Sequence, residues 1–349
     1  MAEGIEVVPV RASPPAGPAS PLVSIVIPAY NCAAFIDEAL QSVYGQTYSH
    51  WEIIVVDDGS TDATSSVLAP HLKRIRYFAQ ENKGTAAARN AGLRRARGEL
   101  IAFLDNDDVW LPEKLELQVR VMHAWPECGL VFTDGKTFTG AGVRRESVLS
   151  RRLDPWLRAH ATGDPLVAKG WMVRELLFAN EISSASSVMV RRELVERVGG
   201  FDEAIAIADD YDLWLKVARE YAVAVIRRCL YMWRWHDESQ SGPTTGREHR
   251  WMEACLVVLE KHLPLAPPDL RGPLRTHVAR LYWNCARHYF GLDQFRDARR
   301  MLVGCLRHNR VFLPALAFLL ASRLDSSIIH GMRRMKRGVQ TWRRRAPAC

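Results

Sequence analysis

The sequence predicts an α/β fold in which a mainly parallel sheet carries helices on both faces and is followed by a C-terminal helical extension. Three observations point to this class. Short apolar, β-branched runs alternate with helical segments from Val23 to Asp108, a pattern typical of strands joined by crossover helices. Two of these runs end abruptly in clustered aspartates, at 57–58 and 105–108. From about Arg247 onward the pattern is helical, with breaks at Pro and Gly-x-Asp.

The expected elements follow this alternation. Strands are expected at 23–28, 51–56, 75–79 and 101–104, with helices near 33–44, 60–70 and 85–92 between them. Later elements are a helix at 112–125, strands at 128–133, 182–190 and 222–233, a helix at 191–198, and helices beginning near 209, 251, 274 and 294. Residues 147–177 are less regular and suit a loop or helical excursion over the sheet, where specificity for an acceptor is expected. The sequence leaves the order of the strands open.

Length and composition set the domain organisation. The chain has 349 residues, 48% hydrophobic and 25% charged, which is enough for one large core or two of ordinary size. We expect a disordered leader at 1–21, an α/β domain at 22–242, an accessory helical segment at 247–310 and an apolar, basic tail at 311–349. The leader lacks a basic region followed by an apolar one, so it is expected to be neither a signal peptide nor an anchor.

The cysteines indicate the compartment. Seven are scattered along the chain without a Cys-x-x-Cys pair, which argues against a zinc site and against a secreted disulfide scaffold. A reducing cytoplasm is therefore the expected setting.

Aspartates at two strand ends are the strongest sign of a site. In Ile101–Asp108 four apolar residues are followed by three carboxylates in four positions, and such closely spaced charges repel unless water or a cation neutralises them. The alternative is a solvated acidic turn that caps the next helix. Asp57 and Asp58 follow the second strand in the same way. Because open α/β sheets bind ligands at their strand ends, one shared site is favoured.

Phosphate recognition cannot use a glycine-rich cradle. Neither Gly-x-Gly-x-x-Gly nor the P-loop pattern occurs, so a dinucleotide-dependent dehydrogenase and a P-loop NTPase are unlikely candidates, and a nucleotidyltransferase lacks the loop it would need. The alanine-rich helix that follows the turn at Asn82 and Gly84 would instead direct its free N–H groups at an anion. Arg89 lies one to two turns into this helix.

A second acidic group begins a later helix. Asp209 and Asp210 precede Tyr-Asp-Leu-Trp-Leu, and their simplest role is to complement the helix dipole. The functional interpretation is that one of them faces the 105–108 strand end as a general base. His236 follows the last long strand and is either a hydrogen-bonded loop residue or a ligand.

Most of the net charge of +8 lies at the C-terminal end. After Ala321 the sequence has eight Lys or Arg residues and a single acid, Asp325, which gives this stretch a net charge of +7. No helix-turn-helix, RNP or zinc-finger pattern accompanies this charge, so nucleic acid is not expected as a partner. The apolar stretch Val311–Ala321 is too short to span a bilayer. An apolar run before a cationic one fits an anionic membrane surface; the alternative is a buried helix followed by a solvated tail.

Several of these motifs, in this order and spacing, resemble the family 2 inverting glycosyltransferases of the GT-A fold. The resemblance covers about Val23–Ser241 and rests on these stretches: Val-Ser-Ile-Val-Ile-Pro-Ala-Tyr-Asn at 23–31, Asp-Asp-Gly-Ser-Thr-Asp at 57–62, Asn-x-Gly at 82–84, Ala-Arg-Asn-x-Gly at 88–92, Asp-Asn-Asp-Asp at 105–108, Gly-Gly-Phe-Asp at 199–202, Asp-Asp-Tyr-Asp-Leu-Trp-Leu at 209–215 and Arg-Trp-His at 234–236.

The resemblance implies a role for each candidate residue. The donor, a nucleotide-diphosphate sugar, would be held by Pro28, Tyr30, Asp57, Asp58, Arg89, Asp105 and Asp107. Asp107, assisted by His236, would reach a divalent cation, Mn or Mg, on the diphosphate. Asp210 would be the catalytic base and Asp209, in the place of the family's usual Glu, its helper. Gly200, Phe201 and Trp214 would lie on the acceptor side.

The resemblance also implies the reaction. A sugar would pass with inversion to the hydroxyl of a glycan or lipid-linked acceptor, in the assembly of cell-surface polysaccharide or glycolipid, and the protein would be cytoplasmic or peripheral on the inner membrane face. The alternative is a catalytically silent protein of the same fold that binds sugar nucleotides or acts as a scaffold.

Overall fold

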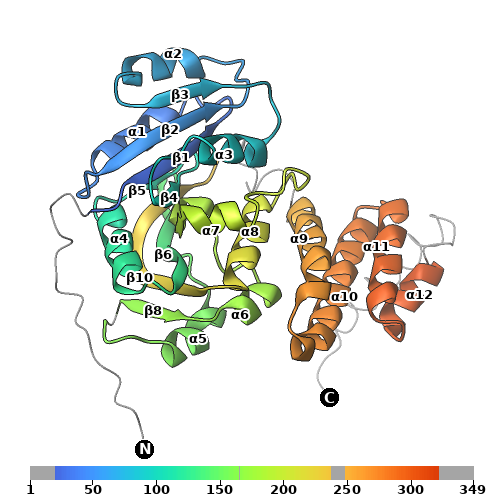
Figure 1. The fold of residues 1–349 in the computed structure, drawn as a ribbon. Coiled ribbons are helices and arrows are strands. Elements are labelled where there is room, and N and C mark those ends of the chain that lie inside the picture. The colour runs from blue at the N-terminus through green and yellow to red at the C-terminus, as the bar shows by residue number, and fades with distance from the viewer. Residues whose placement is uncertain (1–19, 165, 237–247, 322–349) are drawn as a thin grey trace, which may run out of the picture. The chain divides into compact units, whose positions relative to one another are not determined.

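The computed structural model describes residues 20–164, 166–236 and 248–321, and the chain divides into two compact units at 248/249 (Figure 1). The predicted leader, apart from residues 20 and 21, lies outside the described residues, as does the predicted tail beyond residue 321. Each unit is taken by itself below.

The first unit is built on a ten-stranded mixed sheet with the central order β3-β2-β1-β4-β9-β6-β10-β5, while β7 pairs with β6 and β8 with β10. The strands are β1 Val23–Ala29, β2 Trp51–Asp57, β3 Arg76–Ala79, β4 Leu100–Phe103, β5 Val109–Trp110, β6 Cys128–Thr139, β7 Gly142–Arg145, β8 Val167–Gly170, β9 Val188–Arg191 and β10 Ala222–Arg234.

Strand direction determines where the site can form. β3, β2, β1 and β4 are mutually parallel, so their carboxyl ends share one edge. β9 lies antiparallel between β4 and β6, while β10 runs parallel to β6. The predicted mainly parallel α/β sheet is confirmed. The strand order, which the sequence left open, has the antiparallel β9 between β4 and β6.

Helices cover both faces of this sheet, as predicted. They are α1 Ile36–Tyr44, α2 Thr64–Leu68, α3 Thr85–Leu93, α4 Lys114–Ala124, α5 Asp154–Ala159, α6 Val173–Phe178, α7 Arg192–Arg197 and α8 Asp209–Ala218. On one face, Ile25 and Ile27 belong to the same buried cluster as Leu40 of α1. Val26, which points the other way because side chains alternate along a strand, meets α3 at Gly92. A Cβ there would lie 2.4 Å from the Val26 side chain, so glycine permits this close packing.

Two elements differ from their predicted form. The strand expected at 182–190 begins only at Val188, because residues 185–187 form a 3-10 turn in which the Ser184 hydroxyl caps the Ser186 N–H. Serine side chains compete in this way with regular backbone pairing. The helix expected at 60–70 is a five-residue α2 followed by a 3-10 turn at Ala69–His71.

The second unit is helical, which confirms the predicted C-terminal extension. It contains α9 Glu248–His262, α10 Pro268–Gly291, α11 Phe295–His308 and α12 Leu313–Ala321. Gly304 of α11 lies against the Tyr282 ring, and a Cβ at that position would approach the ring to 2.4 Å. Among the described helices, none combines the length and apolar character that crossing a bilayer requires.

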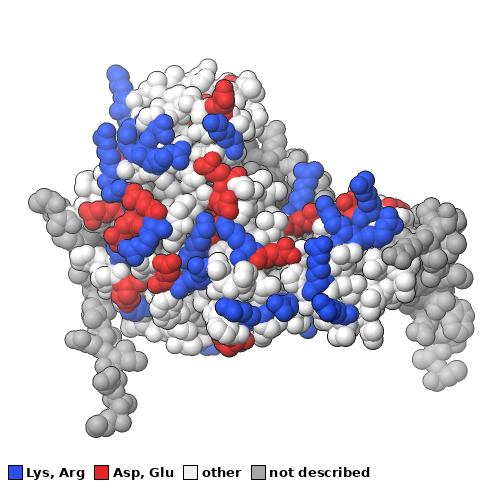
Figure 2. Space-filling view, turned by 45° about the vertical axis from the view of Figure 1, so that its right-hand side comes forward, with Lys and Arg blue, Asp and Glu red and all other residues white. Residues whose placement is uncertain are grey.

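The charged surface is mixed. On the face drawn in Figure 2, acidic side chains lie among the basic ones, and the described residues form no continuous basic stripe across it.

Candidate active site

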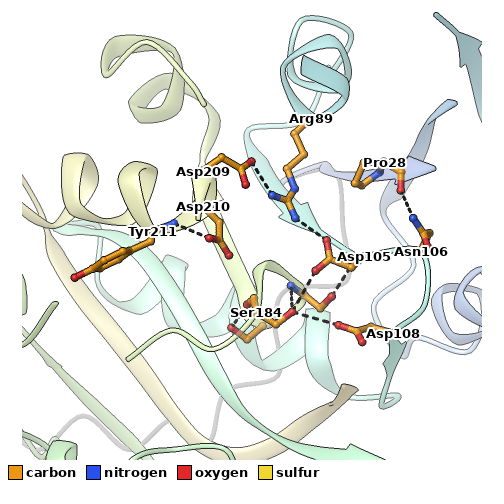
Figure 3. A network of polar contacts seen from close by, with 11 residues as sticks. Pro28, Arg89, Asp105, Asn106, Asp108, Ser184, Asp209, Asp210 and Tyr211 are labelled. Carbon is orange, nitrogen blue, oxygen red and sulfur yellow. Dashed lines mark hydrogen bonds and ion pairs between the residues drawn. The ribbon is translucent and has the colours of Figure 1, made fainter. Parts of the chain in front are cut away.

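The centre of the site is a buried arginine between two carboxylates (Figure 3). Arg89 of α3 places Nη2 2.7 Å from Asp105 Oδ1 and Nη1 2.8 Å from Asp209 Oδ2. Its side chain is only 6% exposed, and the guanidinium lies 5.4 Å from the centre of the Phe201 ring. One desolvated cation therefore connects the end of β4 with the start of α8. Because both terminal nitrogens bind carboxylates, the direct donor contact predicted for Arg89 stays a prediction.

The start of α8 supplies two further acids with different surroundings. Ala208 adopts a left-handed conformation (φ 66°) and turns the chain into the helix, so that Asp209 is buried against Arg89 while Asp210 keeps partial contact with solvent. Asp210 accepts a hydrogen bond from the Tyr211 N–H at 2.7 Å. Burial raises the pKa of Asp210 to about 7, Asp209 adds to the rise, and Arg89 opposes it. A carboxyl group that titrates near neutrality suits a general base.

Three hydrogen bonds hold the end of β4 to two other segments, residues 184–186 and the end of β1. The Asp105 N–H donates to Ser186 Oγ (2.9 Å), the Asn106 side-chain amide donates to the Pro28 carbonyl (2.8 Å), and Ser184 Oγ donates to Asp108 Oδ2 (3.2 Å). Asp108 is fully buried, and burial raises its pKa well above the usual value. This differs from a solvated acidic turn, the alternative for this stretch, because Asp108 has no access to water.

Asp107 is paired with the histidine that follows β10. His236 Nε2 lies 2.9 Å from Asp107 Oδ2, and both side chains are partly exposed. The Arg234 guanidinium donates to the Asp107 carbonyl (2.8 Å) and the Arg234 N–H donates to Asp108 (3.0 Å), which fixes the end of β10 against the end of β4. The Phe35 ring packs on His236 at 4.5 Å.

Asp107 and His236 are the candidate ligands of a divalent cation. Within the described part of the chain, no three His, Cys, Asp or Glu side chains gather in a cluster that could hold a metal ion. Asp107 and His236 offer one oxygen and one nitrogen donor beside each other. Mg²⁺ is commonly held by one or two carboxylates together with substrate phosphates and water. The pair therefore fits a cation whose coordination is completed by a bound diphosphate.

Asp57, the last residue of β2, and Asp58 accept hydrogen bonds from nearby backbone and side-chain donors. Asp57 accepts the Ser60 N–H (2.8 Å) and the Tyr77 hydroxyl (2.7 Å). Asp58 accepts the Lys83 and Gly84 N–H groups (2.9 and 2.7 Å). Asp58 thus fixes the turn that leads into α3.

Tyr30 and Pro28 lie at the neighbouring end of β1. The Tyr30 ring is about half exposed, and the Asp58 N–H donates to the Ala29 carbonyl (2.8 Å). The carboxyl ends of β1 and β2 therefore form one continuous edge, where the sequence predicted nucleotide binding.

Gly200, Phe201 and Trp214, which are predicted on the acceptor side, lie near the start of α8 and in the core that supports it. Gly200 has a φ of 67°, and Asn90 forms two hydrogen bonds with the Phe201 backbone, at 2.9 and 3.0 Å. The Phe201 and Trp214 rings are buried and pack on Phe103, with centroids 5.2 and 6.0 Å apart. Direct contact of these residues with an acceptor stays a prediction; in the structure both rings support the start of α8.

Among the residues of this network to which sequence reasoning gave no role are Asn90, Asp108 and Ser184. Asn90 lies beside Arg89 in the Ala-Arg-Asn-x-Gly stretch at 88–92, but that motif did not indicate its hydrogen bonds to Phe201. The serine-rich stretch around Ser184 was assigned to a strand, although such runs favour local side-chain to backbone hydrogen bonds. That tendency was the available signal.

Parts of the chain are similar in sequence to known glycosyltransferases. The sequence model described as glycosyl transferase family 2 matches residues 24–164. An uncharacterized glycosyltransferase of Rickettsia typhi is 32% identical over 225 residues, which cover 62% of this chain and 65% of the relative. TuaG of Bacillus subtilis, described as a putative teichuronic acid biosynthesis glycosyltransferase, is 44% identical over 117 residues, or 32% of this chain and 46% of the relative. The chain thus spans less than two thirds of these relatives.

Solved structures share the fold at low sequence identity. TarS residues 1–349 from S. aureus, in complex with UDP-GlcNAc, match with a TM-score of 0.60 at 17% identity over 86% of this chain and 88% of that one. The mannosyltransferase PcManGT of Pyrobaculum calidifontis, in complex with GDP-Man and Mn²⁺, matches with a TM-score of 0.52 at 23% identity over 91% and 82%.

Proposed function

We propose that this chain, whose residues 24–164 match the glycosyl transferase family 2 model, transfers a sugar from a nucleotide-diphosphate sugar to an acceptor hydroxyl with inversion at the anomeric carbon. The observation that carries the proposal is Asp210, a carboxyl group with a pKa near neutrality beside the Asp105–Arg89–Asp209 bridge. A catalytically silent binding protein would not need a base poised in this way.

Asp210 acts as the base in this mechanism. The acceptor hydroxyl loses its proton to the Asp210 carboxylate as its oxygen attacks the anomeric carbon, while the diphosphate departs from the opposite side. A single displacement inverts that carbon and needs no protein nucleophile. Arg89 keeps Asp209 in place next to the base, and Phe201 and Trp214 pack beneath them.

The donor is proposed to lie along the ends of β1, β2 and β4. Tyr30 and Asp57 would hold the nucleoside, and Asp105 would lie near the ribose. TarS was solved with UDP-GlcNAc and PcManGT with GDP-Man, which supports a nucleotide-sugar donor for this fold. A divalent cation, when bound by Asp107 and His236, would stabilise the charge that develops on the departing diphosphate.

The proposed setting is the cytoplasm, and the proposed acceptor is a glycan or a lipid-linked saccharide in surface polysaccharide assembly. The supporting finding is the similarity to TuaG, whose description names teichuronic acid biosynthesis.

Release of nucleoside diphosphate tests the function directly. The purified full chain is incubated with UDP- and GDP-sugars, an acceptor mixture and Mn²⁺, and the anomeric configuration of the product is determined by NMR. We expect release with at least one donor and inversion in the product. Thermal shifts recorded in parallel show which donors bind, because a ligand of the native state raises its melting temperature. Binding without turnover for every donor would favour the silent alternative.

The cation is tested through its proposed ligands. With EDTA present, or with Asp107→Asn, we expect turnover to fall about a hundredfold, which is the typical size of a lost electrostatic contribution in a water-poor site. Glu81→Gln removes an exposed acid outside the site and serves as the control. Full activity in EDTA after exhaustive dialysis would remove the metal from the proposal.

A further inference from the structure

The last described helix packs on the second unit through only one side. Ala315 of α12 is fully buried. Phe318 lies 4.9 Å from both the Trp283 and the Phe290 ring of α10, and Phe312, just before α12, lies 5.6 Å from Trp283. These contacts hold α12 in a fixed orientation, so its opposite side is a defined surface.

That opposite side is aliphatic and exposed. Val311 is 80% exposed, Leu313 72% and Leu320 67%, and Leu316 is also exposed. Positions 313, 316 and 320 follow the spacing of one helical face. Single exposed hydrophobic residues are ordinary, but a contiguous group marks an interaction surface. We call these four residues, Val311, Leu313, Leu316 and Leu320, the aliphatic face.

The charged residues that flank the aliphatic face in the sequence are mostly basic. No Asp, Glu, Lys or Arg occurs from Val311 to Ala321, and Arg310 directly before it is exposed. The sequence after Ala321 contains eight Lys or Arg residues and one Asp. An aliphatic surface flanked by cationic sequence matches the chemistry of an anionic bilayer, whose phosphates attract Lys and Arg while its acyl chains accept aliphatic side chains.

We propose that α12 docks on an anionic lipid surface, with the aliphatic face entering the boundary between headgroups and acyl chains. A protein partner fits less well, because protein interfaces surround their apolar centre with a polar rim and the stretch 311–321 has no charged side chain to contribute to one. This proposal rests on the proposed function, because docking there would bring the enzyme to a lipid-linked acceptor.

Vesicle co-sedimentation of the full chain tests the proposal. Vesicles of phosphatidylcholine alone are compared with vesicles of equal parts phosphatidylcholine and phosphatidylglycerol. We expect the chain to sediment with the anionic vesicles only, and less in high salt, because salt screens the attraction. The double variant Leu313→Ser/Leu320→Ser should bind at least about tenfold more weakly, since two exposed leucines would no longer enter the acyl region.

A matched control separates this surface from a general loss of hydrophobicity. Val303→Ser changes an exposed aliphatic residue of α11 in the same unit and should leave vesicle binding unchanged. Equal binding by the double variant, absence of binding by the unaltered chain, or self-association that the double variant abolishes without any vesicle binding would each overturn the proposal. Nucleoside diphosphate release with a water-soluble acceptor, measured on the same samples, shows separately whether the transferase proposal holds.

Discussion

Two strand ends of this molecule carry the same cluster of aspartates, but the groups that surround the carboxylates differ. After β2, Asp57 and Asp58 accept hydrogen bonds from N–H and O–H donors of nearby residues. After β4, Asp105 and Asp108 are crowded with Asp107, and Asp105 shares its one cation, Arg89, with Asp209. At the first end, both carboxylates have several hydrogen-bond donors. At the second end, burial and neighbouring acids raise the pKa values of Asp105 and Asp108.

The surroundings of an acidic strand end therefore depend on segments far away in the sequence. Asp105 is bound by Arg89 of α3 and by Ser186 before β9. Asp209, which binds the same arginine, belongs to α8. If this contrast is correct, substitutions at the β4 end should change turnover and titration, and those at the β2 end should change stability and donor affinity.

Asp210→Asn should have the largest effect. An amide cannot accept the acceptor proton, so kcat should fall by about 10² to 10⁴, the usual contribution of a general base. The same change should raise the melting temperature: a raised carboxyl pKa means that the ionised form is disfavoured in the folded state, and this penalty is fully present above about pH 7. Steady-state kinetics and thermal unfolding at pH 8 measure both effects.

The control for Asp210→Asn is Glu196→Gln, which removes an exposed carboxylate of α7. It should leave kcat and the melting temperature unchanged. Turnover of Asp210→Asn within threefold of the unaltered chain would remove the base from the mechanism and erase the contrast between the strand ends.

Arg89→Gln should rank second. It leaves Asp105 and Asp209 without their shared cation, and removing one partner of a buried ion pair typically costs about 3–5 kcal/mol. Arg89→Lys keeps the charge but cannot bind both carboxylates through a fork, so we expect intermediate stability. Urea unfolding followed by circular dichroism measures the series. An equal free energy of unfolding for all three proteins would show that the bridge does not stabilise the fold.

Sequence reasoning identified both strand ends, the pair at 209–210 and the α/β class, because each depends on local pattern. It could not place Arg89 between Asp105 and Asp209. The contact between Arg89 and Asp209 joins residues 120 positions apart and depends on the start of α8 lying beside α3. Nor could sequence reasoning show that the Phe201 and Trp214 rings are buried, because an aromatic residue fits a core and a binding surface equally well.

Asp58→Asn should have a smaller effect, on the β2 end. One carboxylate oxygen accepts the Gly84 N–H and the other accepts the Lys83 N–H, and an amide has only one acceptor oxygen. Loss of a charge-assisted bond costs about 1.5–3 kcal/mol of unfolding free energy, and a loosened turn before α3 should raise the KM for donor with little change in kcat. Urea unfolding and donor titrations measure both, with Glu81→Gln as the control. A fall in kcat alone would place Asp58 with the catalytic end instead.

Asp209→Asn should produce the smallest change, a shift in pH dependence. Asp210 must be ionised to accept a proton, so kcat/KM of the unaltered chain should rise with pH and reach half its plateau near pH 7. The Asp209 charge raises the pKa of Asp210, so removing it should move this rise to lower pH and increase the relative activity at pH 6. An amide oxygen at 209 can still accept from Arg89, which separates the charge from the contact. Glu196→Gln should leave the profile in place. A rise that stays at the same pH in Asp209→Asn would show that the titrating group is not Asp210, and the two strand ends would then differ in hydrogen bonding alone.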